Sequence, residues 1–536
     1  MTPKFTKWGH VIGILLILLT GRAWALDVAT LNTLATGEAG KKIAAVESLV
    51  NDGDAAALPV LEALSAGTLY ITDSKAVVII TPAAVLDALT GKPVAATPSE
   101  KISINNRLRQ RLNTAIAALR LAAPERALRL AAAIELQKNV SETLLPLIER
   151  RLQLEQDAAV KAALLAAQAG LQLRAAEPAI RLKAIRDLTQ SPSNNTKSLL
   201  LARLEKDVDG NPLEADAAVR QALHSALAAV DARLKWVGYV NHAFNGLSLG
   251  SILLLAALGL AITFGLMGII NMAHGELLMI GAYATYVVQI VFKNYWPIAL
   301  DGYLLAAVPV SFITAALVGM ALERSVIRHL YGRPLETLLA TWGISLLLIQ
   351  TVRVLFGAQN VEVANPVWMS GGWTVMTGLV LPYNRIVIIL FALFVVILVW
   401  AMLNRTRLGL YVRAVTQNRS MAGCMGIPTA KVDVLTFGLG SGIAGLGGCA
   451  LSQIGNVGPE LGQGYIVDSF MVVVLGGVGQ LAGTVVAALG LGEINKFLEP
   501  YAGAVLGKII ILALIIMFIQ KRPQGLFALK GRSAES

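Results

Sequence analysis

Cysteine and histidine are scarce in this chain of 536 residues. It has two cysteines, Cys424 and Cys449, and five scattered histidines. Two thiols in the C-terminal half exclude a disulfide framework for the N-terminal half. No Cys/His spacing typical of a metal site and no nucleophile–base pair is evident. We therefore expect no metal, no cofactor and no enzymatic site.

Charged residues are also few. They make up 15% of the chain against 55% hydrophobic residues, and the mean hydropathy is +0.64. A chain of this size is too apolar for a soluble protein, so the composition predicts a membrane protein. The net charge is +11, but the basic residues form no concentrated patch. This distribution argues against nucleic acid as a partner.

The sequence lacks the G-x-x-x-x-G-K-[ST] loop of nucleotide-binding proteins. The nearest string, Gly503–Ile509, has one residue too few and no hydroxyl. Gly440–Gly445 and Gly477–Ala482 mimic dinucleotide fingerprints, but each lies within an apolar span rather than a soluble βαβ unit. Close helix packing explains them, so ATP hydrolysis is expected from a separate chain.

The first 25 residues have the pattern of a signal peptide. Lys4 and Lys7 precede the apolar run Val11–Leu19, and Ala23-Trp-Ala25 is a typical cleavage site. The run is too short to span a bilayer as an anchor. We expect residues 1–25 to be removed and the following segment to be exported.

The expected exported domain, residues 26–234, is rich in Ala and Leu at helical spacing. Such helix pairs predict an α-helical, repeat-like domain of the α-solenoid type, with a loose resemblance to HEAT-like repeats. Leu69–Thr72 and Val77–Ile80 depart from this pattern, because their β-branched residues favour a small hairpin. Two roles stay open for this domain: a helical spacer, or a docking surface for a substrate-binding protein or another subunit.

Residues 235–530 are expected to form a polytopic bundle of membrane helices, followed by a cytoplasmic tail at 531–536. Its apolar stretches are 247–270, 273–292, 302–322, 335–356, 384–403, 433–453, 466–491 and 503–520. The Arg-rich loops Glu323–Glu336 and Asn404–Asp433 should be cytoplasmic. An exported N-terminal domain and a cytoplasmic C-terminus require an odd number of crossings, which eight simple helices cannot provide.

Two stretches have unusual midpoints. The polar hexapeptide Asn271-Met-Ala-His-Gly-Glu276 lies within sequence that is apolar enough to span a membrane. Irregular backbone and ionisable groups are tolerated in a membrane only where they face protein or water. Residues 466–491 are interrupted by glycines, and treating them as a re-entrant pair of half-helices gives the required odd number of crossings. The candidates for the translocation path are therefore Asn245, Asn271, His274, Glu276, Gly476, Gly477 and Gly479. Helix capping, pairing of Glu276 with His274 or Arg353, and close packing of the glycines are the alternatives.

Several blocks carry a family resemblance. These are Asn245–Gly250, Gly268–Glu276, Leu475–Gly479 and Arg522-Pro-Gln-Gly525. Together they resemble the permeases of the branched-chain amino acid class of ABC importers over about residues 236–530. Within that class, Tyr331–Ser345 and Phe356–Asn360 resemble the first permease subunit of the urea ABC transporter.

The resemblance implies a bacterial inner-membrane protein with several partners. These are cytoplasmic ATP-binding subunits, a second permease subunit in a heterodimer, a periplasmic substrate-binding protein and membrane lipid, with urea as the small neutral substrate. In the resembling importers a segment corresponding to Asn404–Asp433 docks on the ATPase, and here its candidate contact residues are Arg413, Arg419, Ala422, Gly423 and Gly426. An ordinary positive-inside loop is the alternative.

Two other functions stay open at this point. The same machine would import branched-chain amino acids or short amides if the binding protein selected them. A membrane-anchored sensor with an exported ligand-binding solenoid is a function of a different class. The polar hexapeptide and the interrupted helices favour transport over anchoring.

Overall fold

The computed structural model describes residues 28–52, 57–73, 76–81, 84–94, 97–102, 104–138, 144–206, 211–376 and 379–527. The predicted signal peptide and the tail at 531–536 lie outside these residues. The chain divides into an N-terminal unit, Met1–Lys235, and a C-terminal unit, Trp236–Ser536. The boundary falls within one long helix, α11 (Ala217–Met267).

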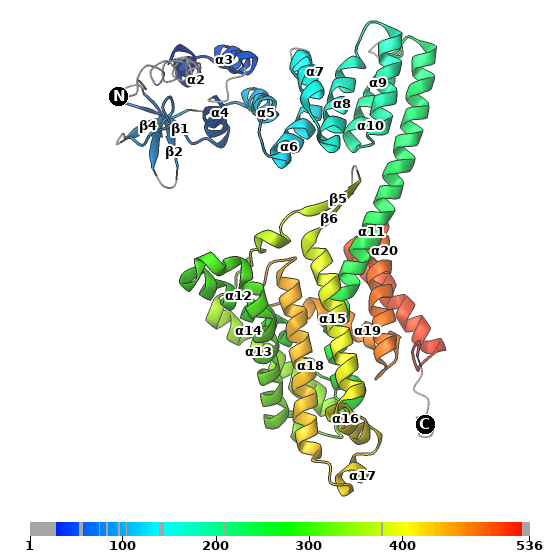
Figure 1. The fold of residues 1–536 in the computed structure, drawn as a ribbon. Helices are drawn as coiled ribbons and strands as arrows, with labels where there is room; N and C mark the ends of the chain where they lie inside the picture. Colours follow the sequence, from blue (N-terminus) through cyan, green and yellow to red (C-terminus); the bar gives the residue numbers. More distant parts are fainter. Residues whose placement is uncertain are drawn as a thin grey trace, which may run out of the picture. The chain divides into compact units, whose positions relative to one another are not determined.

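The N-terminal unit is built mainly from helices that pack on their sequence neighbours (Figure 1). They are α2 (Val28–Thr36), α3 (Ala39–Asp52), α4 (Ala57–Ala66), α5 (Asn106–Arg120), α6 (Arg126–Lys138), α7 (Leu145–Leu154), α8 (Ala158–Gln172), α9 (Pro178–Gln190), α10 (Asn194–Leu204) and the start of α11. Asn105, Asp157 and Ser193 cap the starts of α5, α8 and α10, because their side-chain oxygens accept backbone N–H groups of the first turn.

A four-stranded antiparallel sheet interrupts these helices. The expected hairpin is confirmed, because β1 (Leu69–Thr72) pairs with β2 (Val77–Ile80). Two strands that the sequence analysis missed extend it: β3 (Val85–Asp87) pairs with β2, and β4 (Pro98–Lys101) pairs with β1. The order is β3-β2-β1-β4. These strands escaped detection because β3 has three residues and the sequence of β4, Pro-Ser-Glu-Lys, has no β-branched residue.

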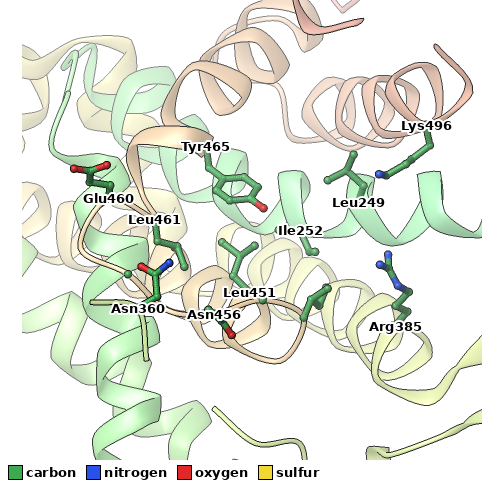
Figure 2. A pocket seen from close by; sticks show the side chains of 13 residues that line it. Leu249, Ile252, Asn360, Arg385, Leu451, Asn456, Glu460, Leu461, Tyr465 and Lys496 are labelled. Atoms are coloured by element: carbon green, nitrogen blue, oxygen red, sulfur yellow. The ribbon is translucent and has the colours of Figure 1, made fainter. Parts of the chain in front are cut away.

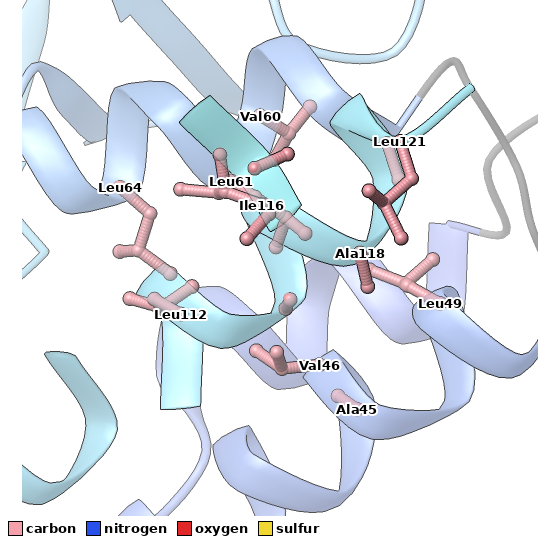
Figure 3. Packing of buried hydrophobic residues seen from close by; sticks show 14 of the residues in the cluster. Ala45, Val46, Leu49, Val60, Leu61, Leu64, Leu112, Ile116, Ala118 and Leu121 are labelled. Carbon is pink, nitrogen blue, oxygen red and sulfur yellow. The ribbon is translucent and has the colours of Figure 1, made fainter. Parts of the chain in front are cut away.

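Alanine and leucine fill the core of this unit. Figure 3 shows Val46 and Leu49 of α3, Leu61 of α4, and Leu112 and Ile116 of α5 packed together. A second cluster continues through α8, α9, α10 and α11. The helical spacing seen in the sequence therefore corresponds to buried faces of neighbouring helices.

An arginine contact recurs along these helices. Nη1 of Arg129 donates to the carbonyls of Ala123 and Pro124, and Nη1 of Arg181 donates to those of Ala175 and Ala176. Arg220 does the same with Glu214 and Ala215.

The first two arginines also pair with a glutamate from the following Glu-x-Asp-Ala-Ala-Val motif. The partners are Glu155 in 155–160 and Glu214 in 214–219, at 2.9 Å each. The unit therefore repeats one helix-end interaction, although the unequal spacing hides it in the sequence.

The C-terminal unit is a helix bundle. After α11 come α12 (His274–Tyr295), η2 (Pro297–Gly302), α13 (Tyr303–Ser325), η3 (Ile327–His329), α14 (Pro334–Phe356), η4 (Val367–Met369), α15 (Tyr383–Arg405), α16 (Arg407–Gln417), α17 (Arg419–Cys424), α18 (Thr429–Ser452), α19 (Gln463–Gly476) and α20 (Leu481–Lys521). A hairpin of β5 (Gly372–Met376) and β6 (Leu379–Pro382) precedes α15.

Seven of these helices are long and apolar enough to cross a membrane. The all-α polytopic bundle is thus confirmed. The difference from eight apolar stretches has a simple origin: residues 466–491 divide into the short helix α19 and the start of α20, and 503–520 form the end of α20. The predicted break is confirmed at Gly477–Gln480, and a second break occurs at Gly503, whose φ is 76°.

Glycine brings the central helices close together. A Cβ on Gly281 of α12 would lie 2.1 Å from the carbonyl oxygen of Gly445 in α18, and a Cβ on Gly448 would lie 1.8 Å from that of Leu278. Backbone cannot move aside as a flexible side chain can, so these positions require glycine. Helices α12, α13 and α18 therefore form the tightly packed centre of the bundle.

Candidate functional site

The polar hexapeptide lies at the start of a helix inside the bundle. α11 ends at Met267, residues 268–273 are not helical, and α12 starts at His274. Asn271 and His274 are fully buried and Glu276 is 2% exposed. Oδ1 of Asn271 accepts the N–H of Ala273 at 3.0 Å, so Asn271 has the capping role that the sequence analysis kept as an alternative.

Each of the three side chains also keeps a polar atom without a hydrogen-bond partner among the described residues. These atoms are Nδ2 of Asn271, Nδ1 of His274 and Oε2 of Glu276. Buried polar atoms of this kind cost free energy, and they rarely persist without a functional or solvent partner. The first turn of α12 is therefore the strongest candidate for a part of the translocation path.

The side chains of this turn face different helices. Nε2 of His274 lies 2.9 Å from the carbonyl oxygen of Ala256 in α11, and the carboxyl group of Glu276 interacts with the Ser345 hydroxyl in α14. The considered pairing of Glu276 with Arg353 is wrong, because Arg353 forms an ion pair with Glu460 instead. No Lys or Arg pairs with Glu276 within the described ranges.

Two helix starts meet at this point. A Cβ on Gly275 of α12 would lie 2.6 Å from the carbonyl oxygen of Gly462, which precedes α19. Because α19 has 14 residues, it is shorter than the roughly 20 residues needed to cross a bilayer. The first turns of α12 and α19 thus lie side by side, which brings two positive helix-dipole ends close together. Gly462 and Ser345 were not predicted from the sequence, since neither carries an ionisable group.

The other candidates for the path lie elsewhere. Asn245 is half-buried, and its Nδ2 donates to the backbone oxygen and Oδ1 of Asn241 in the same helix. Gly476 packs against Gly483, where a Cβ would meet backbone at 2.5 Å. Gly477 and Gly479 have φ values of 101° and 84° in the turn between α19 and α20. The geometry of the three glycines fits the alternative of close packing and turning.

The C-terminal Arg-Pro-Gln-Gly block packs on this glycine turn. The N–H of Leu526 donates to the carbonyl of Leu475 at 2.8 Å, and a Cβ on Gly525 would lie 2.7 Å from Cα of Gly477. Two blocks that carried the family resemblance, far apart in the sequence, are therefore one structural feature.

The loop between α15 and α18 contains α16 and α17. Nη1 of Arg413 donates to the carbonyl of Leu403 at 2.7 Å, and Arg419 forms an ion pair with Asp433. Ala422 is buried, whereas Gly423 and Gly426 are exposed. The two arginines thus tie the loop to the flanking helices α15 and α18. Its exposed large hydrophobic residues are Leu410, Tyr411, Met421 and Met425, with exposed fractions of 57%, 36%, 60% and 77%.

Arg419 also ties this loop to the one before α14. Its guanidinium carbon lies 4.6 Å from the centre of the Tyr331 ring, and the Tyr331 hydroxyl donates to Glu323 at 3.3 Å. Burial lowers the pKa of Arg419, but the hydrogen bond to Asp433 outweighs it and the pKa is raised. Burial, with Asp433 and Glu323 nearby, raises the pKa of Tyr331. The two Arg-rich loops therefore form one connected surface.

Comparison with known proteins agrees with this architecture. The family described as "Branched-chain amino acid transport system / permease component" matches residues 242–519. The permease protein BraD of Pseudomonas aeruginosa, named for high-affinity branched-chain amino acid transport, is 29% identical over 294 residues, covering 54% of this chain and 95% of its own length. LivH of Escherichia coli K12, named likewise, is 29% identical over 299 residues with the same coverage.

A permease named for another substrate also matches. The ribose import permease RbsC of Escherichia coli K12 is 26% identical over 305 residues, covering 52% of this chain and 84% of its own length. No solved structure matches. The family match covers more than half of the chain and the whole bundle from α12 to α19. The chain therefore belongs to the permease components of branched-chain amino acid transport systems.

Proposed function

We propose that this chain forms the translocation path of an ATP-driven importer in the bacterial inner membrane, and that its substrate is urea. The observation that carries the proposal is Glu276. This carboxylate is 2% exposed and lies in the first turn of a helix within the bundle, and its Oε2 has no partner in the described part of the chain. Such a group is costly in a membrane unless it serves a path.

The surroundings of Glu276 suit a neutral solute. Urea has N–H donors on both nitrogens and one strong oxygen acceptor. The first turn of α12 offers a carboxylate oxygen, an imidazole nitrogen and an amide N–H group, and no cation pairs with them within the described ranges. Acceptors and donors without a fixed counter-charge match a small amide better than an ion. The blocks Tyr331–Ser345 and Phe356–Asn360 support urea through their resemblance to the first urea permease subunit.

The proposal includes several partners. Cytoplasmic ATPase subunits supply the energy, a second permease subunit completes a heterodimer, and a periplasmic substrate-binding protein delivers urea. Residues 26–234 are exported after cleavage behind residue 25, and they offer a docking surface to the binding protein or another subunit. Large apolar side chains exposed on α14, α15 and α20 contact lipid or the second permease.

The loop containing α16 and α17 is the proposed ATPase contact. Reversing the charge of Arg419 is a poor test, because a glutamate there would face Asp433 and disturb the loop itself. Met421 and Met425 are better probes, because exposed methionines are enriched at interfaces. Met421→Asp together with Met425→Asp should reduce copurification of the ATPase and lower uptake. The control Lys293→Gln changes an exposed side chain outside Asn404–Asp433 and should leave both unchanged.

Branched-chain amino acids are a second candidate substrate. The observation in their favour is that BraD and LivH, which match almost over their full length, are named for these substrates. Uptake of labelled urea and labelled leucine, by a strain lacking this gene and by the complemented strain, separates the two. We expect complementation to restore urea uptake. If complementation restored leucine uptake alone, leucine rather than urea would be the substrate. If it restored the uptake of neither solute, a transport function would be contradicted.

A further inference from the structure

A cavity of about 500 Å³ with charged, amide and apolar side chains in its wall lies in the C-terminal unit (Figure 2). No residue of the first turn of α12 lines it. Residues from α11, α15, α18, α19 and α20 and from the loops after α14 and α18 line it. The volume is in the range of small-molecule sites. None of the candidates for the path named from the sequence lies in its wall.

One end of the cavity is cationic. In Figure 2 the charged ends of Arg385, from the first turn of α15, and Lys496, from α20, approach Leu249 from two sides. Lys496 pairs with Glu499 at 2.5 Å. Arg385 is half-buried, and its guanidinium has no ion pair or hydrogen bond to other described side chains. A guanidinium held at a cavity wall without a protein partner is a donor available to a ligand.

The opposite end offers oxygen acceptors. Asn360 and Glu460 lie there, and Asn456 lines the cavity nearby (Figure 2). Glu460 is neutralised by Arg353 at 2.5 Å. Asn360 is held against Gly458, where a Cβ would lie 2.1 Å from its Oδ1. The amide oxygens can therefore accept N–H groups without adding net charge.

The cavity shares a wall with the first turn of α12. Glu460, Leu461 and Tyr465 line the cavity, and Gly462 between them contacts Gly275 of α12 through backbone. One segment at the start of α19 thus touches the cavity on one side and the candidate path on the other.

Resting on the proposed function, we propose that this cavity is a solute-binding site that precedes the first turn of α12. Arg385 donates to an oxygen of the solute, either a carbonyl or a carboxylate, and the amide oxygens of Asn360 and Asn456 accept its N–H groups. Urea and an α-amino acid share this chemistry. The apolar wall of Leu249, Ile252 and Leu451 excludes ions that keep a full hydration shell.

Protection from thiol labelling tests the site in the complete importer. Ile454→Cys places one thiol in the cavity wall in a Cys424→Ser background, where the remaining Cys449 is buried. Right-side-out membrane vesicles are treated with a membrane-impermeant thiol reagent in increasing urea, leucine or glycerol, and the labelling rate of this chain is measured. Leu249→Cys on another wall serves if Ile454→Cys reduces the amount of chain in the membrane.

We expect urea or leucine, but not glycerol, to slow labelling at least threefold. Adding Arg385→Gln should raise the half-protecting concentration about tenfold, as expected for loss of a charged hydrogen bond. Arg385→Lys should restore part of the protection. The control Lys293→Gln removes an exposed cation outside the cavity and should change nothing.

The outcomes separate this site from the proposed function. Labelling that no solute slows, in vesicles that still take up solute, would overturn the site and leave the importer standing. Protection unaffected by Arg385→Gln would overturn the role of Arg385. Protection by leucine and not by urea would support the site and contradict urea as the substrate. Protection without any uptake would support the site and contradict transport.

Discussion

Glu214 in the N-terminal unit and Glu276 in the C-terminal unit are both almost fully buried carboxylates. Glu214 accepts from Arg181, Arg203 and the N–H of Asp216, at 2.9, 3.1 and 3.1 Å. Glu276 has a hydroxyl and its own backbone N–H as neighbours, and its Oε2 has no partner among the described residues. Full pairing stabilises a buried charge. We propose that the incomplete set of partners at Glu276, inside a membrane bundle, leaves this group available to a solute.

The two units also differ in how their helices approach each other. Leucine and alanine side chains fill the space between helices in the N-terminal unit. In the C-terminal unit, Gly281, Gly445 and Gly448 bring backbones into contact instead. The hydrophobic effect drives packing in water, whereas lipid offers no such force and favours close backbone contact.

The largest expected effect tests the glycine contacts. Gly448→Ala places a methyl group 1.8 Å from the backbone oxygen of Leu278, so we expect a loss of at least about 3 kcal/mol of stability. Gly490→Ala is the matched control, because a Cβ there meets nothing within 4 Å. Thermal unfolding of the purified chains in detergent measures both. Equal melting temperatures of the two variants would show that close backbone contact at Gly448 does not stabilise the C-terminal unit.

Breaking the pairing of Glu214 should have an effect of similar size. Glu214→Ala leaves Arg181 buried and unpaired, and we expect a loss of about 3–5 kcal/mol. The control Glu62→Ala breaks a half-exposed pair with Arg120 and should cost less than about 1 kcal/mol. Denaturant unfolding of residues 26–234, expressed as a soluble protein, measures both. A circular-dichroism spectrum typical of a disordered chain would contradict the expectation that this segment folds on its own.

The stability of the N-terminal unit should also fall at acid pH. The hydrogen bond from Arg129 holds the pKa of Glu155 below its usual value. Burial raises the pKa of Glu214, but hydrogen bonds from Asp216 and Arg181 outweigh it and lower the pKa. Lowered carboxylate pKa values contribute stability above about pH 4.5, and this contribution is lost as the pH falls through the folded-state values.

Denaturant midpoints of residues 26–234 between pH 7 and pH 3 should therefore decrease on the acid side. Glu155→Gln should flatten this decrease, because glutamine does not titrate. A midpoint that stays constant to pH 3 would show that these carboxylates do not depend on ionisation for their contribution.

The smallest effect is expected at Asn245. Its side chain bonds within its own helix, so Asn245→Ala should change solute uptake by less than about twofold. Uptake by intact cells, corrected for the amount of chain in the membrane, measures this. A strong loss of uptake would indicate that Asn245 lines the translocation path and that half-buried positions of α11 contact the solute.

Local patterns in the sequence predicted the elements well. Hydropathy located the spans, β-branched residues located the β1–β2 hairpin, and the glycines of 476–479 located the break after α19. These features depend on neighbours in the chain, so a single sequence contains them. Strands β3 and β4 were not predicted, because they are strands through their pairing with β2 and β1 rather than through their composition.

Contacts between distant segments could not be predicted. Arg353 pairs with Glu460, whereas the sequence suggested Glu276. Lys508 pairs with Asp468, which lies 40 residues away in the chain. The cavity brings Arg385 and Lys496 together from separate helices. Several residues have the right charge to form each ion pair, and only the packing of the helices determines which of them is the partner.

Uptake of labelled urea by the Glu276→Gln variant tests the central claim most directly. Glutamine keeps the size of the side chain and its bond to Ser345 but removes the charge that lacks a partner. We expect the variant to reach the membrane in normal amounts, to copurify with the ATPase and to lose most urea uptake. Uptake at the wild-type rate would contradict the placement of the translocation path at the first turn of α12.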